Sequence, residues 1–378
     1  MKDFEDFLLY RLWIAYLEAR KGKRKTFDEH IFELNDIENI VNLRDDILNR
    51  TYEPSPSEAF IIHDPVIREI FAAPFRDRIV HHLIYDFTYD WWDKHFIPDS
   101  YSCRVGRGTL YGKQRFERHA RAASNNFSED IFVAKLDLSG YFMSLNRKKL
   151  LERALWGLDK QFQNNKGKVY WMLRYLWRQT IMDDPVSKMR IRGKIKDWDK
   201  VPKNKSLIHQ PKGYGIVIGN LTSQLLSNIY LDQLDRYITF NLGYKHYGRY
   251  VDDFYIIVKM SEKEKLLGDI KKIENYLKTL ELTLHPKKRT FTSLSHGINF
   301  LGDTLYPGYM VPGKRVKTKT KKAFRDFAEG HGDIESVTSY LGHLKHTNST
   351  KFLSEVFDSL GWDFEPGERN TTAPNNGR

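Results

Sequence analysis

The chain has 378 residues, of which 40% are hydrophobic and 14% aromatic, enough for two or three packed subdomains. Its 61 Lys and Arg residues outnumber 49 Asp and Glu residues, and a net charge of +12 suits a polyanionic partner. No apolar run approaches the roughly 18 residues needed to span a bilayer, and the acidic opening MKDFEDFLLY is unlike a signal peptide. These features favour nucleic acid over a membrane as the partner. The single cysteine, Cys103, excludes an intrachain disulfide and a cysteine-rich zinc site, and we expect a cytoplasmic protein.

Apolar residues at helical spacing predict a helix within the first twenty residues and a second from about Asp28 to Asn49. The basic run RKGKRK (20–25) separates them. Residues 65–95 are predicted to be mostly helical. IFVAKLDL (131–138) is predicted to be a strand, because it is rich in β-branched and apolar residues, and a cationic helix follows it.

Residues 183–212 are polar, interrupted by proline, and carry nine Lys and Arg residues. They predict a loop or an inserted ribbon, which either is a solvated basic surface or contacts nucleic acid. Helical periodicity returns in residues 219–238, and residues 245–260 predict a strand, a tight turn and a second strand. A helix over about 262–282, short strands and a basic helical region from residue 314 follow. The last fourteen residues have the composition of a disordered tail.

Three carboxylates occupy the ends of predicted strands. Asp137 lies at the end of one strand, and Asp252 and Asp253 lie in the turn between two others. Asp is common in turns, so a surface hairpin is the simplest explanation for adjacent aspartates. If the strands pair, however, three acids crowd one sheet edge, which is costly unless cations neutralise them. Carboxylates suit Mg²⁺, and two ions about 3.5–4 Å apart promote in-line nucleotidyl transfer.

The surrounding motifs resemble those of reverse transcriptases. Tyr250–Val251–Asp252–Asp253 is similar to their Y-x-D-D box, and Asp137–Leu138–Ser139–Gly140–Tyr141–Phe142 to their first palm motif. Further similar blocks follow the family's order over about residues 65–305: REIFAAPFRDRIVHH (68–82), SYSCRVGRGT (100–109), LHPKK (284–288) and NFLG (299–302). The resemblance implies an RNA-directed DNA polymerase, a nucleotidyltransferase that copies template RNA into cDNA from dNTPs and a primer. It also implies an α+β right-hand fold of fingers, palm and thumb with an antiparallel palm sheet.

The resemblance divides the chain into five parts. These are an N-terminal helical basic extension (1–50), fingers (51–130), a palm with the remaining fingers elements and the basic insertion at about 183–212 (131–305), a helical thumb (306–362) and a disordered tail (363–378). The basic runs RKGKRK and KRVKTKTKK (314–322) are expected either to contact the phosphate backbone or to be solvated faces.

The same resemblance assigns the catalytic and metal-binding roles. Asp137 and Asp252 would bind two Mg²⁺ ions, with Mn²⁺ as an alternative, and the backbone carbonyl of Leu138 would complete one site. Asp253 would assist metal or primer binding. Phe300, Leu301 and Gly302 would grip the primer.

The nucleotide site follows from the same motifs. Its expected members are Arg68, Ser139, Gly140, Tyr141, Phe142, Ile218, Gly219 and Lys288. The N–H groups of Gly140 and Tyr141 would hold the triphosphate, and Phe142 would exclude a ribose 2′-OH or else be an ordinary core residue. Arg68 would contact the phosphates or else be a surface charge. Lys288 would protonate pyrophosphate, a role its neighbour Lys287 could also fill.

Two departures from the common family pattern concern fidelity and nucleotide contact. Many reverse transcriptases have Gln-Gly-x-x-x-Ser-Pro where this chain has Ile218–Gly219–Asn220–Leu221–Thr222–Ser223–Gln224. The box with Ile218 and Gln224 is similar to that of diversity-generating retroelements, whose enzymes copy RNA with errors at adenines and rewrite a target gene by mutagenic retrohoming. Val66 stands where related enzymes often have a lysine, two residues before the fingers arginine.

The resemblance to diversity-generating enzymes also implies a partner, a small basic helical accessory protein that can be oligomeric. Two other interpretations stay open. One is a small bacterial reverse transcriptase of another kind, for example in phage defence, which could share Ser-Gln in place of Ser-Pro. The other is a nucleic-acid-binding protein with an inactive palm, against which the intact Asp137, Asp252, Asp253 and Phe142 argue.

Overall fold

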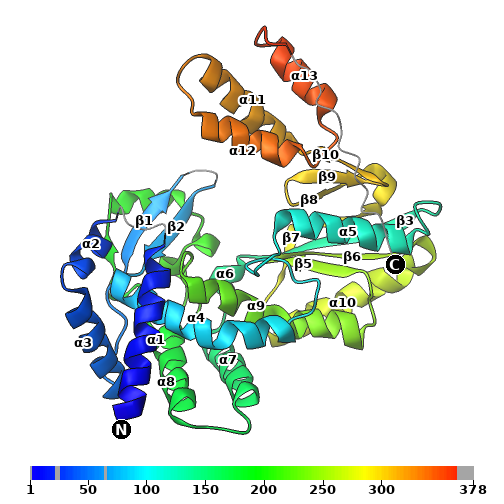
Figure 1. Cartoon of the computed structure of the whole chain (residues 1–378). Helices are drawn as coiled ribbons and strands as arrows, with labels where there is room; N and C mark the ends of the chain where they lie inside the picture. Colours follow the sequence, from blue (N-terminus) through cyan, green and yellow to red (C-terminus); the bar gives the residue numbers. More distant parts are fainter. Residues whose placement is uncertain (1, 22–25, 64–65, 364–378) are drawn as a thin grey trace, which may run out of the picture. The chain divides into compact units, whose positions relative to one another are not determined.

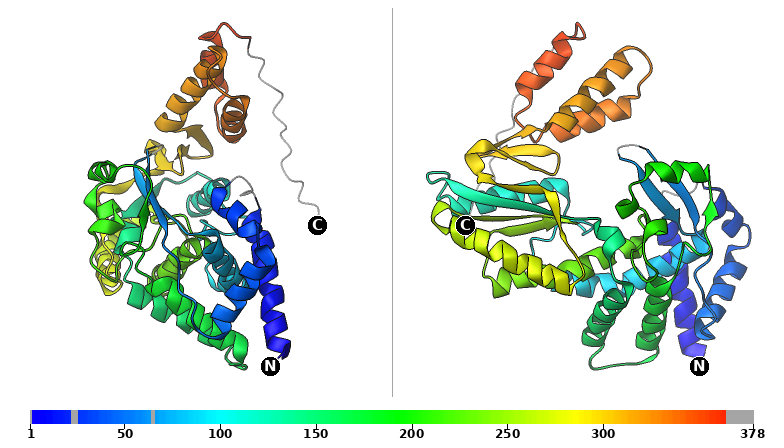
Figure 2. Two further views of the ribbon diagram at one scale, coloured as in Figure 1. Left: turned by 90° about the vertical axis from the view of Figure 1, so that its left-hand side faces the viewer. Right: turned by 180° about the vertical axis from the view of Figure 1, so that it is seen from behind.

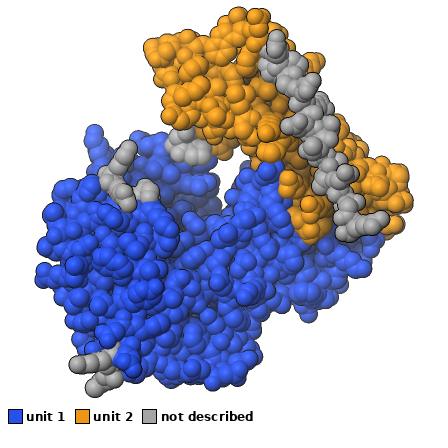
Figure 3. Space-filling view, viewed as in Figure 1, with its two compact units in different colours: residues 1–112, 134–256, 262–289 blue, residues 113–133, 257–261, 290–378 orange. Residues whose placement is uncertain are grey.

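A computed structural model describes residues 2–21, 26–63 and 66–363 of the chain. It divides into two compact units, residues 1–112, 134–256 and 262–289, and residues 113–133, 257–261 and 290–378 (Figure 3). No helix among the described residues is long and apolar enough to cross a membrane. The predicted tail and most of the run RKGKRK lie outside the described residues.

The first unit begins with helices that pack against one another (Figure 1). Helix α1 (Lys2–Arg20) lies along α4 (Phe75–His95) and α3 (Asp36–Leu48), and Figure 2 shows them from two other directions. The N-terminal helix is confirmed. The predicted helix over 28–49 is wrong in one respect, because it is two helices: α2 (Phe27–Glu33) ends before Asn35, and α3 begins at Asp36.

A three-stranded sheet has the order β2–β1–β4, and its strands β1 and β2 precede α4 in the chain. Strands β1 (Glu58–Ile62) and β2 (Arg68–Ala72) are antiparallel, and the two-residue β4 (Arg190–Ile191) pairs parallel with β1. The prediction that residues 65–95 are mostly helical is therefore wrong for residues 68–72. Exposed Arg68 is followed by buried Glu69, and burial alternates along the strand. Such alternation is typical of a paired strand and was missed when the segment was interpreted as a helix.

A four-stranded sheet, in the order β5–β6–β3–β7, carries the acidic motifs. The predicted strand at 131–138 is confirmed as β3 (Ile131–Leu138), of which all residues but Lys135 are buried. Strands β5 (Tyr247–Tyr250) and β6 (Asp253–Lys259) are antiparallel and confirm the predicted strand, turn and strand. Strand β7 spans Leu284–Ser293.

The remaining helices of the first unit follow or flank this sheet. They are α6 (Tyr141–Ser144), α7 (Arg147–Gln161), α8 (Lys168–Met182), α9 (Leu221–Arg236) and α10 (Lys263–Thr279). The segment 183–212 is irregular apart from β4 and the 3₁₀ turns η1 (Ile195–Lys200), η2 (Lys203–Lys205) and η3 (Leu207–His209), as predicted for a loop. Helix α5 (Thr109–Ala123) precedes β3 in the chain. It begins at the end of a first-unit segment, and its residues from Lys113 onward belong to the second unit.

Besides most of α5, the second unit contains an antiparallel sheet and three helices that follow it in the chain. Its strands are β8 (Ile298–Phe300), β9 (Asp303–Tyr306) and β10 (Tyr309–Pro312). Its helices are α11 (Lys314–Ala328), α12 (Ile334–Leu344) and α13 (Thr350–Asp358), which share a core built around Phe324, Leu344 and Phe352. The basic helical region predicted from residue 314 is confirmed. With its helical and sheet layers, the chain has the right-hand polymerase fold with an antiparallel palm sheet.

Candidate active site

The acidic turn joins β5 to β6. Tyr250 pairs with Asp253 across the two strands, so that Val251 and Asp252 alone form the turn. Val251 has a φ of 56°, in the left-handed region that costs an L-residue roughly 1–2 kcal/mol. A β-branched residue there is an outlier of the kind found at functional sites. The turn therefore needs support from its surroundings.

Three neighbouring groups provide this support. The Val251 N–H donates to Ser102 Oγ (3.0 Å), and the Val251 carbonyl accepts a hydrogen bond from Arg249 Nη1 (2.8 Å). The Asp252 carbonyl accepts from the Leu138 N–H (3.1 Å). Because Leu138 follows Asp137, the last bond sets the separation of the Asp137 and Asp252 backbones. The turn is thus clamped to β3, to its own strand and to the loop before α5.

The Asp137 and Asp252 carboxylates interact electrostatically. Asp137 is buried at the end of β3, and Lys288 Nζ lies 3.0 Å from each of its oxygens. No side chain in the described part of the chain donates to the Asp252 carboxylate; burial first, and then Asp137, raise its pKa, against the lowering effect of Lys288 and Arg68. Asp137 and Asp252 thus lie close enough to interact, with Lys288 in contact with Asp137 and the charge of Arg68 acting on Asp252.

Asp253 takes a different partner from the other two acids. Its carboxylate lies 3.0 Å from Lys135 Nζ. Burial raises the pKa of Asp253 to about 6, although Lys135 lowers it. Sequence reasoning missed Lys135, but a signal was present. Residues two apart on a strand share a face, so Lys135 lies on the same side of β3 as Asp137.

The three carboxylates lie close enough to interact, because Asp137 and Asp252 both raise the pKa of Asp253. No cluster of three or more His, Cys, Asp or Glu side chains with the geometry to hold a metal occurs among residues 2–21, 26–63 and 66–363. Lys135 forms an ion pair with Asp253. Asp137 and Asp252 nevertheless fit Mg²⁺, because this ion is usually held by one or two carboxylates, with waters and substrate phosphates completing its shell.

The residues expected to contact the nucleotide gather beside this pair. Gly140 follows β3 with a φ of 55°, a conformation that glycine adopts without strain. Tyr141 is buried, and its hydroxyl donates to the Ser227 carbonyl (2.5 Å). Phe142 and Ile218 are both half-buried and pack on the same apolar cluster. The structure thus brings the expected steric gate and the expected fidelity residue together.

The other members of this set lie nearby in the first unit. The Ser139 N–H donates to the Thr283 carbonyl (2.9 Å), which links β3 to the chain entering β7. Gly219 has a φ of 117° and lies beside Ile70 of β2. Arg68 on β2 is exposed, and its charge is felt at Asp252. Gln224 is exposed in the first turn of α9.

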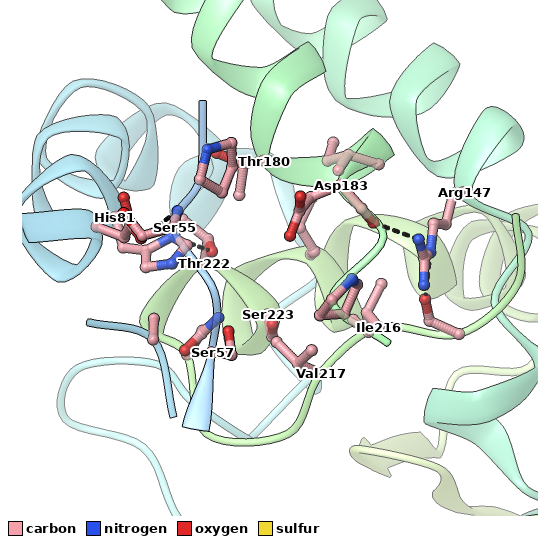
Figure 4. Close-up of a pocket in the computed structure, with 18 residues that line it drawn as sticks. Ser55, Ser57, His81, Arg147, Thr180, Asp183, Ile216, Val217, Thr222 and Ser223 are labelled. Carbon is pink, nitrogen blue, oxygen red and sulfur yellow. Dashed lines mark hydrogen bonds between the residues drawn. The ribbon is translucent and has the colours of Figure 1, made fainter. Parts of the chain in front are cut away.

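A small cavity of about 50 Å³ lies behind the segment that carries Ile218 (Figure 4). Its wall includes Ile216, Val217 and the buried Thr222, whose hydroxyl is 2.9 Å from His81 Nδ1. Burial lowers the pKa of His81 to about 3, so its ring is neutral at physiological pH. The cavity is large enough for a water molecule, and its mainly apolar wall also carries polar side chains such as Thr222 and His81.

The expected primer grip belongs to the second unit. Phe300 is buried, and its ring centroid is 5.8 Å from that of Phe116, which makes it a core residue. Leu301 and Gly302 form the turn between β8 and β9, with φ values of 51° and 94°. In the same unit, a groove beside α11 is lined by Lys314, Lys317, Lys321 and Lys351.

Sequence reasoning also missed the polar network that holds the turn. Arg249 is fully buried and pairs with Asp235 of α9, which accepts a further hydrogen bond from Tyr247 (2.6 Å). Ser102, which caps the turn, is itself tied to Asn228 of α9 by its backbone carbonyl (2.8 Å). Arg249 directly precedes the Tyr250–Asp253 motif in the sequence, but only the fold reveals that its partner lies on α9.

The family comparison agrees with this geometry. The family described as "Reverse transcriptase (RNA-dependent DNA polymerase)" matches residues 66–305, more than half of the chain and all of the site in the first unit from Arg68 onward. No curated protein sequence matches the chain.

Two solved structures are similar at low identity. A telomerase from Candida albicans, in complex with the TWJ fragment of telomeric RNA, has a TM-score of 0.49 and 12% identity, and the match covers 84% of this chain and 58% of that one. An apo telomerase from Candida tropicalis gives 0.49 and 12%, over 83% and 60%. This chain thus spans less than two thirds of either, and a likeness at this TM-score carries no argument. On the family match, the chain belongs to the reverse transcriptase (RNA-dependent DNA polymerase) family.

Proposed function

We propose that this chain copies template RNA into cDNA by nucleotidyl transfer at Asp137 and Asp252, as part of a diversity-generating retroelement. One observation supports the proposed catalytic role of these carboxylates. The hydrogen bond from the Leu138 N–H to the Asp252 carbonyl holds their backbones together, and Asp137 raises the pKa of Asp252. Two Mg²⁺ ions, or Mn²⁺, would be held by Asp137, Asp252 and the Leu138 carbonyl, and would activate the primer 3′-hydroxyl and neutralise the leaving pyrophosphate. Asp253, paired with Lys135, would contribute to the field of the site.

The chain's own groups would position the nucleotide. The N–H groups of Gly140 and Tyr141 would bind the triphosphate with Arg68, and the Phe142 ring would occupy the space of a ribose 2′-OH. Lys288 can reach the reacting phosphates because its side chain is more than half exposed and its only ion-pair partner in the described residues is Asp137. It would donate a proton to pyrophosphate.

Replacing Asp252 with Asn tests the catalytic assignment. The variant should lose Mg²⁺-dependent dNTP incorporation on a primed RNA template, because an amide binds a divalent cation far more weakly than a carboxylate does. Asp159→Asn, a surface change on α7 in the same unit, is the matched control and should retain activity. Incorporation by Asp252→Asn at the wild-type rate would refute the metal assignment.

The subclass rests on Ile218 and Gln224. A glutamine amide at position 218 could hydrogen-bond the sugar and detect a misaligned pair, whereas isoleucine offers only apolar contact. Discrimination against a wrong nucleotide should therefore relax. The position of Ile218 on the cluster that also takes Phe142 supports this proposal, because a change in one alters the packing of the other.

Sequencing the cDNA made by the purified enzyme tests the subclass. Errors concentrated at template adenines, and reduced in Ile218→Gln, support diversification. Uniformly accurate or untemplated cDNA would favour the phage-defence alternative instead. Unchanged adenine errors in Ile218→Gln would refute the role of Ile218.

The partner and location follow from the same proposal. We propose that the enzyme works with a small basic helical accessory protein. We also propose that it acts in the cytoplasm, where a single cysteine is stable as a thiol. Affinity purification from the native host would identify the accessory protein and the template RNA together.

A further inference from the structure

The basic segment 183–212 is anchored by a buried carboxylate. Glu69 on β2 is 1% exposed and accepts hydrogen bonds from Trp198 Nε1 (3.0 Å), Ser206 Oγ (2.7 Å) and the Leu207 N–H. A buried carboxylate is costly unless it is hydrogen-bonded. All three donors come from this segment. If the segment moved away from β2, the Glu69 carboxylate would lose these hydrogen bonds.

Apolar packing fixes the same part of the segment. Trp198 and Leu207 are buried in the cluster that includes Phe71 of β2 and Met143 of α6. The half-buried Phe142 and Ile218 pack on this cluster too. The segment is therefore an ordered wall of the nucleotide site and not the detached ribbon that its composition suggested.

The turn η2 touches the expected triphosphate cradle. A Cβ placed on Gly140 would lie 2.7 Å from the Asn204 carbonyl oxygen, so only glycine allows this approach. Lys203 and Lys205 flank Asn204 on η2 and are both exposed. Each lysine is one residue from the Asn204 carbonyl that approaches Gly140, and its flexible four-carbon stem allows the ammonium group to turn toward a phosphate bound at Gly140 and Tyr141.

The two lysines differ from their neighbours in the same segment. Lys188 is paired with Asp183, and Lys200 with Asp197. Within the described residues, neither Lys203 nor Lys205 has a hydrogen-bonded or ion-paired side-chain partner. Two unneutralised cations held beside Gly140 form an anion site that the fold maintains.

The chain has one cation fewer beside the fingers arginine than the family pattern has. Val66 stands where the family pattern has a lysine beside the fingers arginine, and it leaves Arg68 as the cation of β2 next to the site. Glu69, the neighbour of Arg68, is the residue that holds the segment in place. The strand that begins two residues after Val66 thus holds the segment that carries Lys203 and Lys205.

We infer that Lys203 and Lys205 bind the triphosphate of the incoming deoxynucleoside triphosphate and replace the lysine missing at position 66. This inference rests on the proposed polymerase function. Lysine suits the role because its ammonium is a compact charge with three donors, and hydrogen bonds between charged groups and phosphate are the strong ones.

Steady-state kinetics of Lys203→Ala/Lys205→Ala tests the inference on a primed RNA template. The KM for dNTP should rise at least about tenfold, the effect of losing one charge-assisted hydrogen bond, because the variant lacks both ammonium groups. The kcat should change by less than about twofold, and inhibition by pyrophosphate should weaken. The Kd for template–primer, measured by fluorescence anisotropy, should stay the same, and Lys203→Arg/Lys205→Arg should restore the KM.

The matched control is Lys194→Ala/Lys196→Ala, which removes two exposed lysines from the same segment without touching η2. It should leave the KM for dNTP unchanged. An unchanged KM in the Lys203/Lys205 variant, an equal rise in the control, or a weaker Kd for template–primer would overturn the inference. Failure of the polymerase proposal is distinct, because the wild-type enzyme would then incorporate no dNTP at all.

Discussion

Arg249 and Asp235 form a bidentate ion pair beneath the acidic turn, with Nε–Oδ1 and Nη2–Oδ2 distances of 2.7 Å and no solvent exposure of either side chain. The remaining Arg249 nitrogen donates to the Val251 carbonyl. Arg249 therefore links α9 to the turn that carries Asp252, and the position of the turn depends on that of α9. We expect it to position the catalytic carboxylate rather than only to stabilise the fold.

Asp235→Asn tests this role against Asp232→Asn. Asp232 lies one turn earlier on α9, is equally buried and pairs with Arg153 and Arg236, away from the acidic turn. Each variant should lower the free energy of unfolding by about 3–5 kcal/mol. Only Asp235→Asn should also lower kcat per folded molecule, by about tenfold to a hundredfold. Equal specific activities, after correction for the folded fraction by urea denaturation, would contradict the positioning role.

Lys288 and Asp137 lead to a prediction about metal binding. The ammonium contacts both carboxylate oxygens, so it competes with a divalent cation for them. Lys288→Ala should strengthen Mn²⁺ binding to the free protein up to about fivefold, the scale of an exposed ion pair, while it slows dNTP incorporation. Lys287→Ala is the control, since Lys287 has no ion pair in the described residues. Weaker Mn²⁺ binding in Lys288→Ala, measured by electron paramagnetic resonance, would argue against the competition.

Local patterns in the sequence were sufficient for the parts of the site that repeat a motif. The β-branched run of β3 and the strand, turn and strand around Asp252 follow from period and composition, and the family match covers both. The roles given to individual site residues stay predictions. These roles were assigned from the spacing of residues in the motifs. In a strand, spacing alone decides on which face a side chain lies.

The errors arose where long-range contacts outweighed local pattern. The helix expected over 28–49 breaks near Asn35. Strand β2 forms because it pairs with β1, a partner that its own residues do not specify. The segment 183–212 has the composition of a solvated loop, yet its position depends on Glu69, 129 residues before Trp198. The Lys135–Asp253 and Arg249–Asp235 pairs were missed for the same reason.

Two glycines in helices of the first unit predict opposite stability changes. A Cβ on Gly157 of α7 would lie 2.1 Å from the Trp92 ring, whereas one on Gly268 of α10 would meet no atom within 4 Å. Gly157→Ala should lower the free energy of unfolding by about 1–3 kcal/mol through overpacking. Gly268→Ala should raise it by about 0.5–1 kcal/mol through helix propensity. Chemical denaturation of both variants measures the difference, and the same sign for both would contradict the packing around Trp92.

Glu281 gives a prediction about acid stability. Its carboxylate accepts hydrogen bonds from Tyr214 (2.5 Å) and Asn146 (3.0 Å), and Lys149 lies 2.9 Å away. These partners, Tyr214 first, lower the pKa of Glu281 to about 2 from its ordinary 4.5. A carboxyl group with a lowered pKa stabilises the fold above its unfolded pKa, and this contribution is lost as the pH falls through the folded value. The difference in free energy of unfolding between wild type and Glu281→Gln should therefore be constant above about pH 5 and shrink towards pH 2. Glu264→Gln, a surface change on α10 outside this cluster, should show no such trend, and a constant difference for Glu281→Gln down to pH 2 would contradict the lowered pKa.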